Sequence, residues 1–153
     1  MRTAEEVLKE KGMKIYSVES GSTIEYAILK MCNYKIGAIL IEKDGNIIGI
    51  WTERDLLYNV KDGDFNPKTA IIDDYMTKNL IFAEADETVF NLMDKYLGKH
   101  LRHLLIKKEE NIIGILSTGD VLKASLNAKS DELNKLHAMV SWEYYSNWRW
   151  DKK

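Results

Sequence analysis

The sequence is poor in cysteine and proline. It has 153 residues and contains one of each, Cys32 and Pro67. A single cysteine excludes a disulfide within the chain and fits a reducing compartment, so we expect a cytoplasmic protein. We expect the Cys32 side chain to be buried as a small hydrophobic group, because it lies near the apolar face of a predicted helix and has no convincing basic partner.

Long apolar runs and an excess of one charge are also missing. No run approaches the roughly 20 residues that span a bilayer, and no signal peptide is visible, so we expect no membrane association. The net charge is −2 with both signs mixed along the chain, which disfavours nucleic-acid binding. The three histidines, His100, His103 and His137, show no spacing with acidic residues that is typical of a metal site.

The most informative feature that is present is an internal repeat. Shifted by 65 residues, the chain matches itself without a gap, and 13 of the 48 residues in 13–60 are identical to their partners in 78–125. The strongest match joins residues 43–50 to residues 108–115, which share Asn-Ile-Ile-Gly-Ile. The repeat predicts two copies of one structural unit.

Each copy predicts the same order of elements. Thr23 and its equivalent Thr88 begin helices whose apolar residues recur at helical spacing. In the first copy, residues 38–41 form an apolar run typical of a strand buried on both faces. A tight-turn signal and a returning strand over 47–51 complete a hairpin, and a second helix follows over 52–60. One such unit buries too little surface for stability on its own, so we expect the two to pack together.

The boundaries follow from the repeat and from the most loop-like segment, residues 62–67. We expect a first unit with an N-terminal helix over 1–66, a second unit over 67–128, and an aromatic-rich C-terminal helix or tail over 129–153. Three of the four tryptophans lie in this tail. Packing on the core, contact with a second copy, and a role in partner binding or ligand gating all remain open for it.

The junction between strand and helix in each copy could carry chemistry. It reads Gly-Ile-Trp-Thr-Glu-Arg-Asp over 49–55 and Gly-Ile-Leu-Ser-Thr-Gly-Asp over 114–120. The glycine lets a ligand or another chain segment approach the strand. The hydroxyl of Thr52 or Ser117 lies where a helix begins, and free N–H groups and the helix dipole favour a phosphate there.

An aspartate follows each hydroxyl by three residues. The carboxylates of Asp55 and Asp120 could accept hydrogen bonds from the two hydroxyls of a ribose, and Arg54 would add a charge-assisted contact to a phosphate. Helix capping explains the same pattern, because a Thr or Ser N-cap with an acidic residue three positions later resembles a capping box. The residues alone leave both interpretations open.

Both copies resemble cystathionine-β-synthase (CBS) domains over about residues 13–127. The resemblance rests on the Gly-apolar-apolar-Thr/Ser-x-x-Asp stretches, the apolar strands before them, and Ile36-Gly37-Ala38 in the first copy. It implies an α+β fold in which two β-α-β-β-α units pack about a pseudo-twofold axis, with N- and C-terminal helices added. In that family, clefts between the units bind AMP, ADP, ATP or related adenosyl ligands such as S-adenosylmethionine.

The resemblance also implies roles for individual residues. Thr52 and Ser117 would contact phosphate, and Asp55 and Asp120 would contact ribose. A small pair at the strand start of the first copy would line an adenine slot, and a basic pair at the same place in the second copy would reach phosphate. The expected nucleotide-binding residues are Gly37, Ala38, Thr52, Arg54, Asp55, Arg102, His103, Ser117 and Asp120. Because the copies differ around the shared motif, we expect two unequal sites.

The function that this resemblance favours is a regulatory ligand sensor and not an enzyme. The sequence shows no paired catalytic carboxylates, no Ser-His-Asp set and no Walker-type loop. We expect an adenine nucleotide as regulatory ligand, no catalytic cofactor, a homodimer and an unidentified effector protein. The ligand would act by shifting a conformational equilibrium. The alternatives are a structural dimerisation module with empty clefts and, less favoured, an enzyme that processes the nucleotide.

Overall fold

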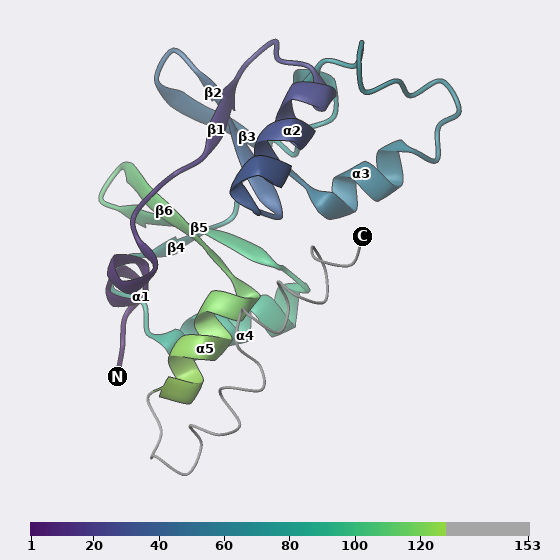
Figure 1. The fold of residues 1–153 in the computed structure, drawn as a ribbon. Helices are drawn as coiled ribbons and strands as arrows, with labels where there is room; N and C mark the ends of the chain where they lie inside the picture. The colour runs from purple at the N-terminus through teal and green to yellow at the C-terminus, as the bar shows by residue number, and fades with distance from the viewer. Residues whose placement is uncertain (128–153) are drawn as a thin grey trace. The chain divides into compact units, whose positions relative to one another are not determined.

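The computed structural model describes residues 1–127, which form two units (Figure 1). The first-repeat unit is Ile15–Leu80, and the second-repeat unit joins Met1–Lys14 to the chain from Ile81 onward. Within residues 1–127, each unit contains one three-stranded sheet. The fold is therefore α+β with a tandem arrangement, as the sequence predicted. The expected C-terminal helix or tail over 129–153 lies outside the described residues.

The first-repeat unit has the order of elements that the sequence predicted. Its sheet has the strand order β1-β2-β3, with β1 parallel to β2 and β2 antiparallel to β3. A short 3₁₀ helix, η1, follows the repeat. The elements are β1 (Ser17–Glu19), α2 (Ile24–Tyr34), β2 (Ala38–Lys43), β3 (Asn46–Thr52), α3 (Glu53–Asn59) and η1 (Ile72–Asp74).

The second-repeat unit has the same topology, with strand order β4-β5-β6. The register of its hairpin shifts between Ile106 and Lys107, and the first hairpin shifts at the equivalent place, between Ile41 and Glu42. The repeat therefore extends to the pairing of the strands. The elements are α1 (Ala4–Lys11), β4 (Phe82–Glu84), α4 (Val89–Lys99), β5 (His103–Lys108), β6 (Asn111–Ser117) and α5 (Thr118–Asn127).

Local signals in the sequence account for where several elements begin and end. The hydroxyls of Thr23 and Thr88 accept hydrogen bonds from the third backbone N–H that follows, each at 3.2 Å, so both predicted N-caps are confirmed. The turn of the first hairpin has positive φ at Asp44 (52°) and Gly45 (80°). Two such angles match the twist of the flanking strands, and Asp-Gly is the sequence that favours them.

Each unit buries its own hydrophobic core between the sheet and its helices. Ile39 and Ile41 on β2 are fully buried, and so are Leu104 and Ile106 on β5. Leu40, which points to the other face of β2, is only 1% exposed. The prediction of a strand buried on both faces is therefore confirmed. In the second unit, α4 and α5 pack beside each other against the sheet (Figure 1).

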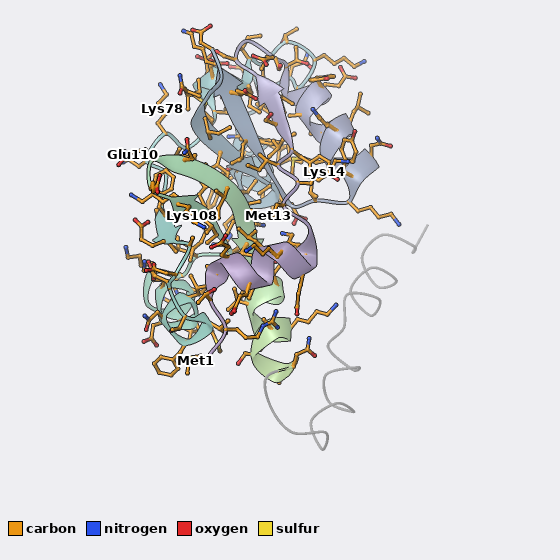
Figure 2. The ribbon with its side chains drawn as sticks, turned by 90° about the vertical axis from the view of Figure 1, so that its left-hand side faces the viewer. Met1, Met13, Lys14, Lys78, Lys108 and Glu110 are labelled. Carbon is orange, nitrogen blue, oxygen red and sulfur yellow. The ribbon has the colours of Figure 1, made fainter. Side chains whose placement is uncertain are left out.

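The N-terminal helix packs on the second-repeat unit, whereas the sequence placed it with the first. Ala4 N–H donates to the Glu87 carbonyl at 2.8 Å, and Val89 N–H donates to the Arg2 carbonyl at 2.9 Å. Lys108, labelled in Figure 2, bonds the Glu5 carboxylate through its ammonium at 3.1 Å. The helix buries its apolar face against α5 and β6, surface that the repeat by itself leaves uncovered.

The expected boundary at residue 66 also differs from the structure, because the chain up to Leu80 stays with the first-repeat unit. Ile72 N–H donates to the Ser22 carbonyl at 2.9 Å, and the Ile72 side chain is fully buried in the first core. The Asp73 carboxylate accepts from the Ser20 hydroxyl and from Gly21 N–H. These bonds hold the pKa of Asp73 below its usual range.

The expectation of a buried Cys32 is wrong. The thiol is free and exposed, although it lies on α2 directly after the buried residue Met31. The buried residues of this helix are Ile24, Ala27 and Met31. One residue further along an α-helix is a rotation of about 100°, which carries Cys32 off the buried stripe and toward solvent.

Candidate functional site

In the first-repeat unit, the strand start meets the helix start. Ala38 pairs with Thr52 across β2 and β3, and Glu53 N–H donates to the Gly37 carbonyl at 3.0 Å. Three of the residues expected to bind nucleotide, Gly37, Ala38 and Thr52, are thus neighbours. The Glu53 carboxylate lies against the Cα of Gly37, where it would collide with a Cβ. This acidic group beside the expected adenine slot is not among the residues that the sequence predicted for the site.

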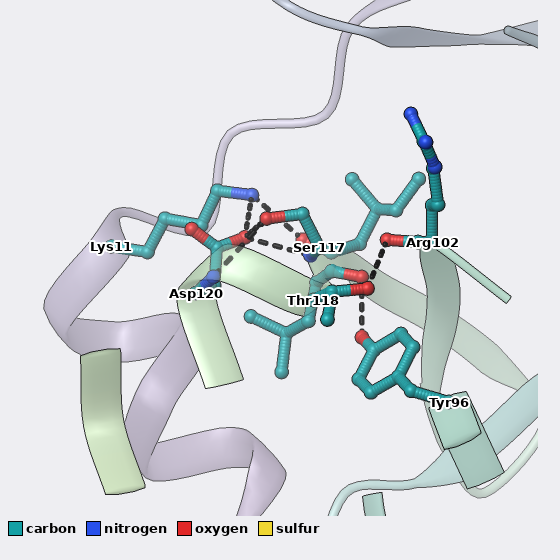
Figure 3. Close-up of polar contacts among 8 residues, drawn as sticks. Lys11, Tyr96, Arg102, Ser117, Thr118 and Asp120 are labelled. Atoms are coloured by element: carbon teal, nitrogen blue, oxygen red, sulfur yellow. Dashed lines mark hydrogen bonds and ion pairs between the residues drawn. The ribbon is translucent and has the colours of Figure 1, made fainter. Parts of the chain in front are cut away.

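The second-repeat unit repeats this geometry with different side chains. His103 pairs with Ser117 across β5 and β6, and Thr118 N–H donates to the Arg102 carbonyl at 2.9 Å. The Thr118 hydroxyl also donates to this carbonyl, at 3.3 Å (Figure 3). The expected site residues of the second copy therefore lie together as well.

The glycines of the two junctions face protein and not an open space. A Cβ at Gly114 would lie 2.7 Å from Cδ2 of Leu8, on α1. A Cβ at Gly49 would collide with the Met76 side chain. The sequence allowed either a ligand or another chain segment to approach the strand at these glycines. The structure shows another chain segment there.

Thr52 and Asp55 form a complete capping box at the start of α3. Thr52 N–H donates to Oδ2 of Asp55 at 2.8 Å, and Asp55 N–H donates to the Thr52 hydroxyl at 3.3 Å. The hydroxyl donates to the same Oδ2 at 3.1 Å. Helix capping therefore accounts for this geometry. None of the three bonds uses Oδ1 of Asp55, which lies outside the box.

Ser117 and Asp120 make the same box at the start of α5, and a lysine joins it. Ser117 N–H and its hydroxyl donate to Oδ2 of Asp120 at 2.7 and 2.9 Å. The Lys11 ammonium bonds the same Oδ2 at 2.7 Å and the Ile115 carbonyl at 3.1 Å (Figure 3). The Asp120 side chain is only 5% exposed and that of Lys11 is 37% exposed, so a nearly buried carboxylate holds a half-buried cation.

Lys11 is the residue of this site that the sequence analysis missed. It lies 109 residues from Asp120 along the chain, and it belongs to α1, outside the repeat. Its only sequence signal is that of a basic residue in the last turn of an amphipathic helix, where lysine is common for reasons of the helix dipole alone.

Asp55 differs from Asp120 in this respect, because no lysine or arginine of residues 1–127 forms a salt bridge with it. Arg54, which the sequence analysis placed on a phosphate, is exposed. The two motifs therefore share their capping geometry and differ in the charges around it.

His103 is held in its neutral form. Burial lowers the pKa of the imidazole to about 4, and the nearby Lys11 and Arg102 cations lower it further, against the opposing effect of Asp120. A neutral imidazole can donate one hydrogen bond to a phosphate but brings no charge to it. Of the two basic residues expected here, Arg102 is the one that carries a positive charge at neutral pH.

Tyr96 bonds the backbone at the end of β6, next to this site. Its hydroxyl donates to the Leu116 carbonyl at 2.6 Å and is buried (Figure 3). Burial raises the pKa of this phenol, and the Asp120 carboxylate raises it further. Tyr96 therefore remains protonated and ties α4 to the end of β6.

Residues 1–127 lack two other features, a metal-binding cluster and a membrane-spanning helix. No group of three or more His, Cys, Asp or Glu side chains in this part of the chain could hold a metal ion. None of its helices combines the length and the apolar character that crossing a membrane requires.

Comparison with known proteins identifies the family. The model of the CBS domain family matches residues 4–62 and 72–127, which together make up well over half of the chain. The chain belongs to the CBS domain family and carries two copies of the domain. Each copy contains one complete strand-to-helix motif, Thr52–Asp55 or Ser117–Asp120.

Two of its relatives match it over most of their own length. CBS domain-containing protein CBSX3, mitochondrial, of Arabidopsis thaliana is 28% identical over 151 residues, which cover 93% of this chain and 73% of the relative. The crystal structure of a CBS-domain containing protein from Agrobacterium tumefaciens is 30% identical, with a TM-score of 0.77. That match covers 81% of this chain and 99% of the other.

Two further structures of the same fold contain adenosyl ligands. One is a CBS domain pair in complex with 5′-methylthioadenosine and S-adenosyl-L-methionine, with 19% identity, a TM-score of 0.72, and coverage of 84% of this chain and 99% of that one. The other is CBSX2 in complex with AMP, with 20% identity, a TM-score of 0.66, and coverage of 78% and 93%. At these identities the likeness concerns the fold.

Proposed function

We propose that this protein is a regulatory module that binds an adenine nucleotide and does not transform it. One observation carries the proposal. In each unit, a backbone hydrogen bond joins the strand start, at Gly37 or Arg102, to the start of the helix that carries the Thr/Ser-x-x-Asp motif. Groups suited to adenine, ribose and phosphate are thereby gathered at one place.

The chemistry of these groups suits a nucleotide. The Thr52 or Ser117 hydroxyl would bind phosphate, and the Asp55 or Asp120 carboxylate would bind the ribose hydroxyls through the oxygen outside the capping box. Exposed Arg54 and Arg102 would add charge-assisted contacts to phosphate. The proposed ligands are AMP, ADP, ATP or S-adenosylmethionine. The AMP, methylthioadenosine and S-adenosylmethionine bound to structures of the same fold support this choice.

The proposed mechanism is a population shift. A ligand that binds one conformation more tightly than another increases the fraction of the first by its difference in affinity. An effector protein would read the favoured conformation, and the module would act as a homodimer in the cytoplasm. These parts of the proposal rest on the sequence and on the family.

A second candidate function is a structural dimerisation module without nucleotide. The complete capping boxes favour it, because Thr52 with Asp55 and Ser117 with Asp120 stabilise their helices whether or not a ligand binds. An enzyme that processes the nucleotide is disfavoured. Asp55 and Asp120 each cap a helix through Oδ2, and no group of three or more His, Cys, Asp or Glu side chains within residues 1–127 could hold a metal ion.

Isothermal titration calorimetry of the full chain with AMP, ADP, ATP and S-adenosylmethionine distinguishes these functions. We expect binding of at least one ligand, and chromatography of the mixture after incubation should recover that ligand intact. Heats no larger than those of dilution for all four ligands contradict the sensor and favour the structural module. Release of phosphate or adenine would instead establish an enzyme.

A further inference from the structure

We propose that Lys11 makes the Ser117–Asp120 motif selective for phosphorylated nucleotides, and that the Thr52–Asp55 motif lacks this selectivity. This inference rests on the proposed function and names the ligand class of one of its two sites. It starts from the ion pair between Lys11 and Asp120, which has no equivalent at Asp55 in the part of the chain that the structure describes.

Lys11 lies beside the carboxylate that would hold a ribose. Its ammonium lies 2.7 Å from Oδ2 of Asp120 and also bonds the Ile115 carbonyl at 3.1 Å. The ribose would bind through Oδ1, the oxygen outside the capping box, so a ligand without a phosphate leaves this ion pair in place. Because the Asp120 side chain is only 5% exposed, breaking the pair without a new anion for the ammonium would be unfavourable.

A phosphate offers the ammonium a second anion, and an uncharged ligand does not. The lysine stem is flexible, carries three donors and is 37% exposed here, so the ammonium can reach toward a phosphate on the same ligand. One of its donors then makes a charge-assisted bond to the phosphate. Adenosine offers Lys11 no new partner, so the lysine adds nothing to its affinity.

Positive side chains lie close to the second motif. Lys11 bonds Asp120 there, and the Arg102 carbonyl accepts a hydrogen bond from the start of the helix. At the first motif, Asp55 forms no salt bridge with a lysine or arginine of residues 1–127. Lys11 therefore adds an attraction for phosphate at the second motif, by an amount that salt reduces.

The carbonyl equivalent to the one that bonds Lys11 has a different partner in the first-repeat unit. In the first-repeat unit, the backbone of Ile50 is paired with that of Thr77 by two hydrogen bonds of 3.0 and 2.8 Å. Ile115 is equivalent to Ile50, and its carbonyl accepts from the Lys11 ammonium instead. Lys11 thus also has a structural role, and a test must separate selectivity from stability.

The test follows backbone amide shifts of the full chain by NMR during titration with adenosine and with ATP. The amides of Ser117 and Thr118 report the second motif, and those of Thr52 and Glu53 report the first. In the wild type we expect ATP to bind the second motif at least about tenfold more tightly than adenosine does. In Lys11→Met, which keeps the apolar stem, this preference should fall to about threefold or less, while the preference at the first motif is unchanged.

Two control variants complete the design. Lys11→Arg keeps the charge and should keep the preference. Lys9→Met removes a charge from the exposed side of the same helix, where Lys9 pairs with Glu5 at 3.2 Å, and should have no effect. An ATP preference in Lys11→Met equal to that of the wild type overturns the inference and leaves Lys11 a structural role only.

If Lys11→Met does not fold, salt provides the same test on the wild type. Raising the salt concentration should weaken ATP binding at the second motif more than at the first, and equal weakening overturns the inference. Failure of the proposed function looks different. In that case neither ligand shifts the amides of either motif, and the inference fails with it.

Discussion

Asp55 and Asp120 occupy equivalent positions, yet their surroundings differ enough to predict different effects on stability. Asp120→Asn removes the ion pair with Lys11 and weakens the capping box, whereas Asp55→Asn weakens only a box. We expect the free energy of unfolding to fall by about 2 kcal/mol for Asp120→Asn and by about 1 kcal/mol for Asp55→Asn, as measured by urea denaturation. Equal losses would show that Lys11 contributes nothing to the fold.

The His103 imidazole makes a second prediction, on pH. Its pKa is lowered to about 4 from the ordinary 6.5, first by burial and then by Lys11. Between these two values the unfolded chain binds more protons than the folded chain, so stability rises with pH across this window and is lost as the pH falls through it. The imidazole resonance, assigned with His103→Gln, should titrate below pH 5. A midpoint near 6.5 would contradict the burial of this ring.

At the level of side chains, the sequence was informative where the interaction is local. Thr23, Thr88 and Thr52 were predicted to begin helices, and each caps one, because an N-cap and its partner are three residues apart. Lys11 was not anticipated because its partner lies 109 residues away. Cys32 was assigned to the buried side of its helix, and a difference of one residue in helical phase reversed its exposure.

Among the helices and strands, the packing of α1 on β6 is the contact that the sequence did not predict, and it can be tested directly. A Cβ at Gly114 would lie 2.7 Å from Leu8 Cδ2. We expect Gly114→Ala to destabilise the protein by about 1–3 kcal/mol through overpacking. Leu8→Ala should cost about 2–5 kcal/mol on its own, because Leu8 is 1% exposed and leaves a cavity.

The double variant distinguishes this packing from a general loss of stability. Truncating Leu8 makes room for the new methyl group, so Gly114→Ala with Leu8→Ala should destabilise less than the sum of the two single variants. Gly63→Ala is the matched control, since a Cβ there meets nothing within 4 Å, and it should change stability little. Additive effects in thermal or urea unfolding would mean that α1 does not cover β6.

The repeat predicted these helices and strands well because its two copies fold into the same elements. The buried strand over 38–41, the returning strand over 47–51 and the order of elements are all observed. An offset in sequence cannot say which unit a segment outside the repeat will cover. Residues 1–14 and 67–80 were therefore assigned by proximity along the chain, and both belong to the unit on the other side of the expected boundary.

The chain as a whole consists of two units, each completed by a segment outside its own repeat. A chain lacking residues 1–12 loses Ala4, Val7 and Leu8 from the second core. We expect hydrogen exchange measured by mass spectrometry to speed up in β4–β6 and α4–α5 and to change little in β1–β3. Equal acceleration in both sheets, or acceleration confined to β1–β3, would contradict the assignment of α1 to the second-repeat unit.

For the chain as a whole, the sequence predicted the family and both motifs, because the repeat and the spacing of its residues can be read directly from the sequence. The site itself was predicted only as a set of candidate residues. The structure shows that the members of each set are neighbours, and the capping boxes explain why residue types alone could not decide between a ligand and a helix cap.

The most direct test of nucleotide binding by these motifs is the affinity of ATP for the wild type, Asp55→Ala and Asp120→Ala, measured by calorimetry on the full chain. We predict that each substitution weakens binding at its own motif by about 1–3 kcal/mol, the range for losing a hydrogen bond to a charged group. Wild-type affinity and stoichiometry in both variants would contradict the assignment of Asp55 and Asp120 to the ribose.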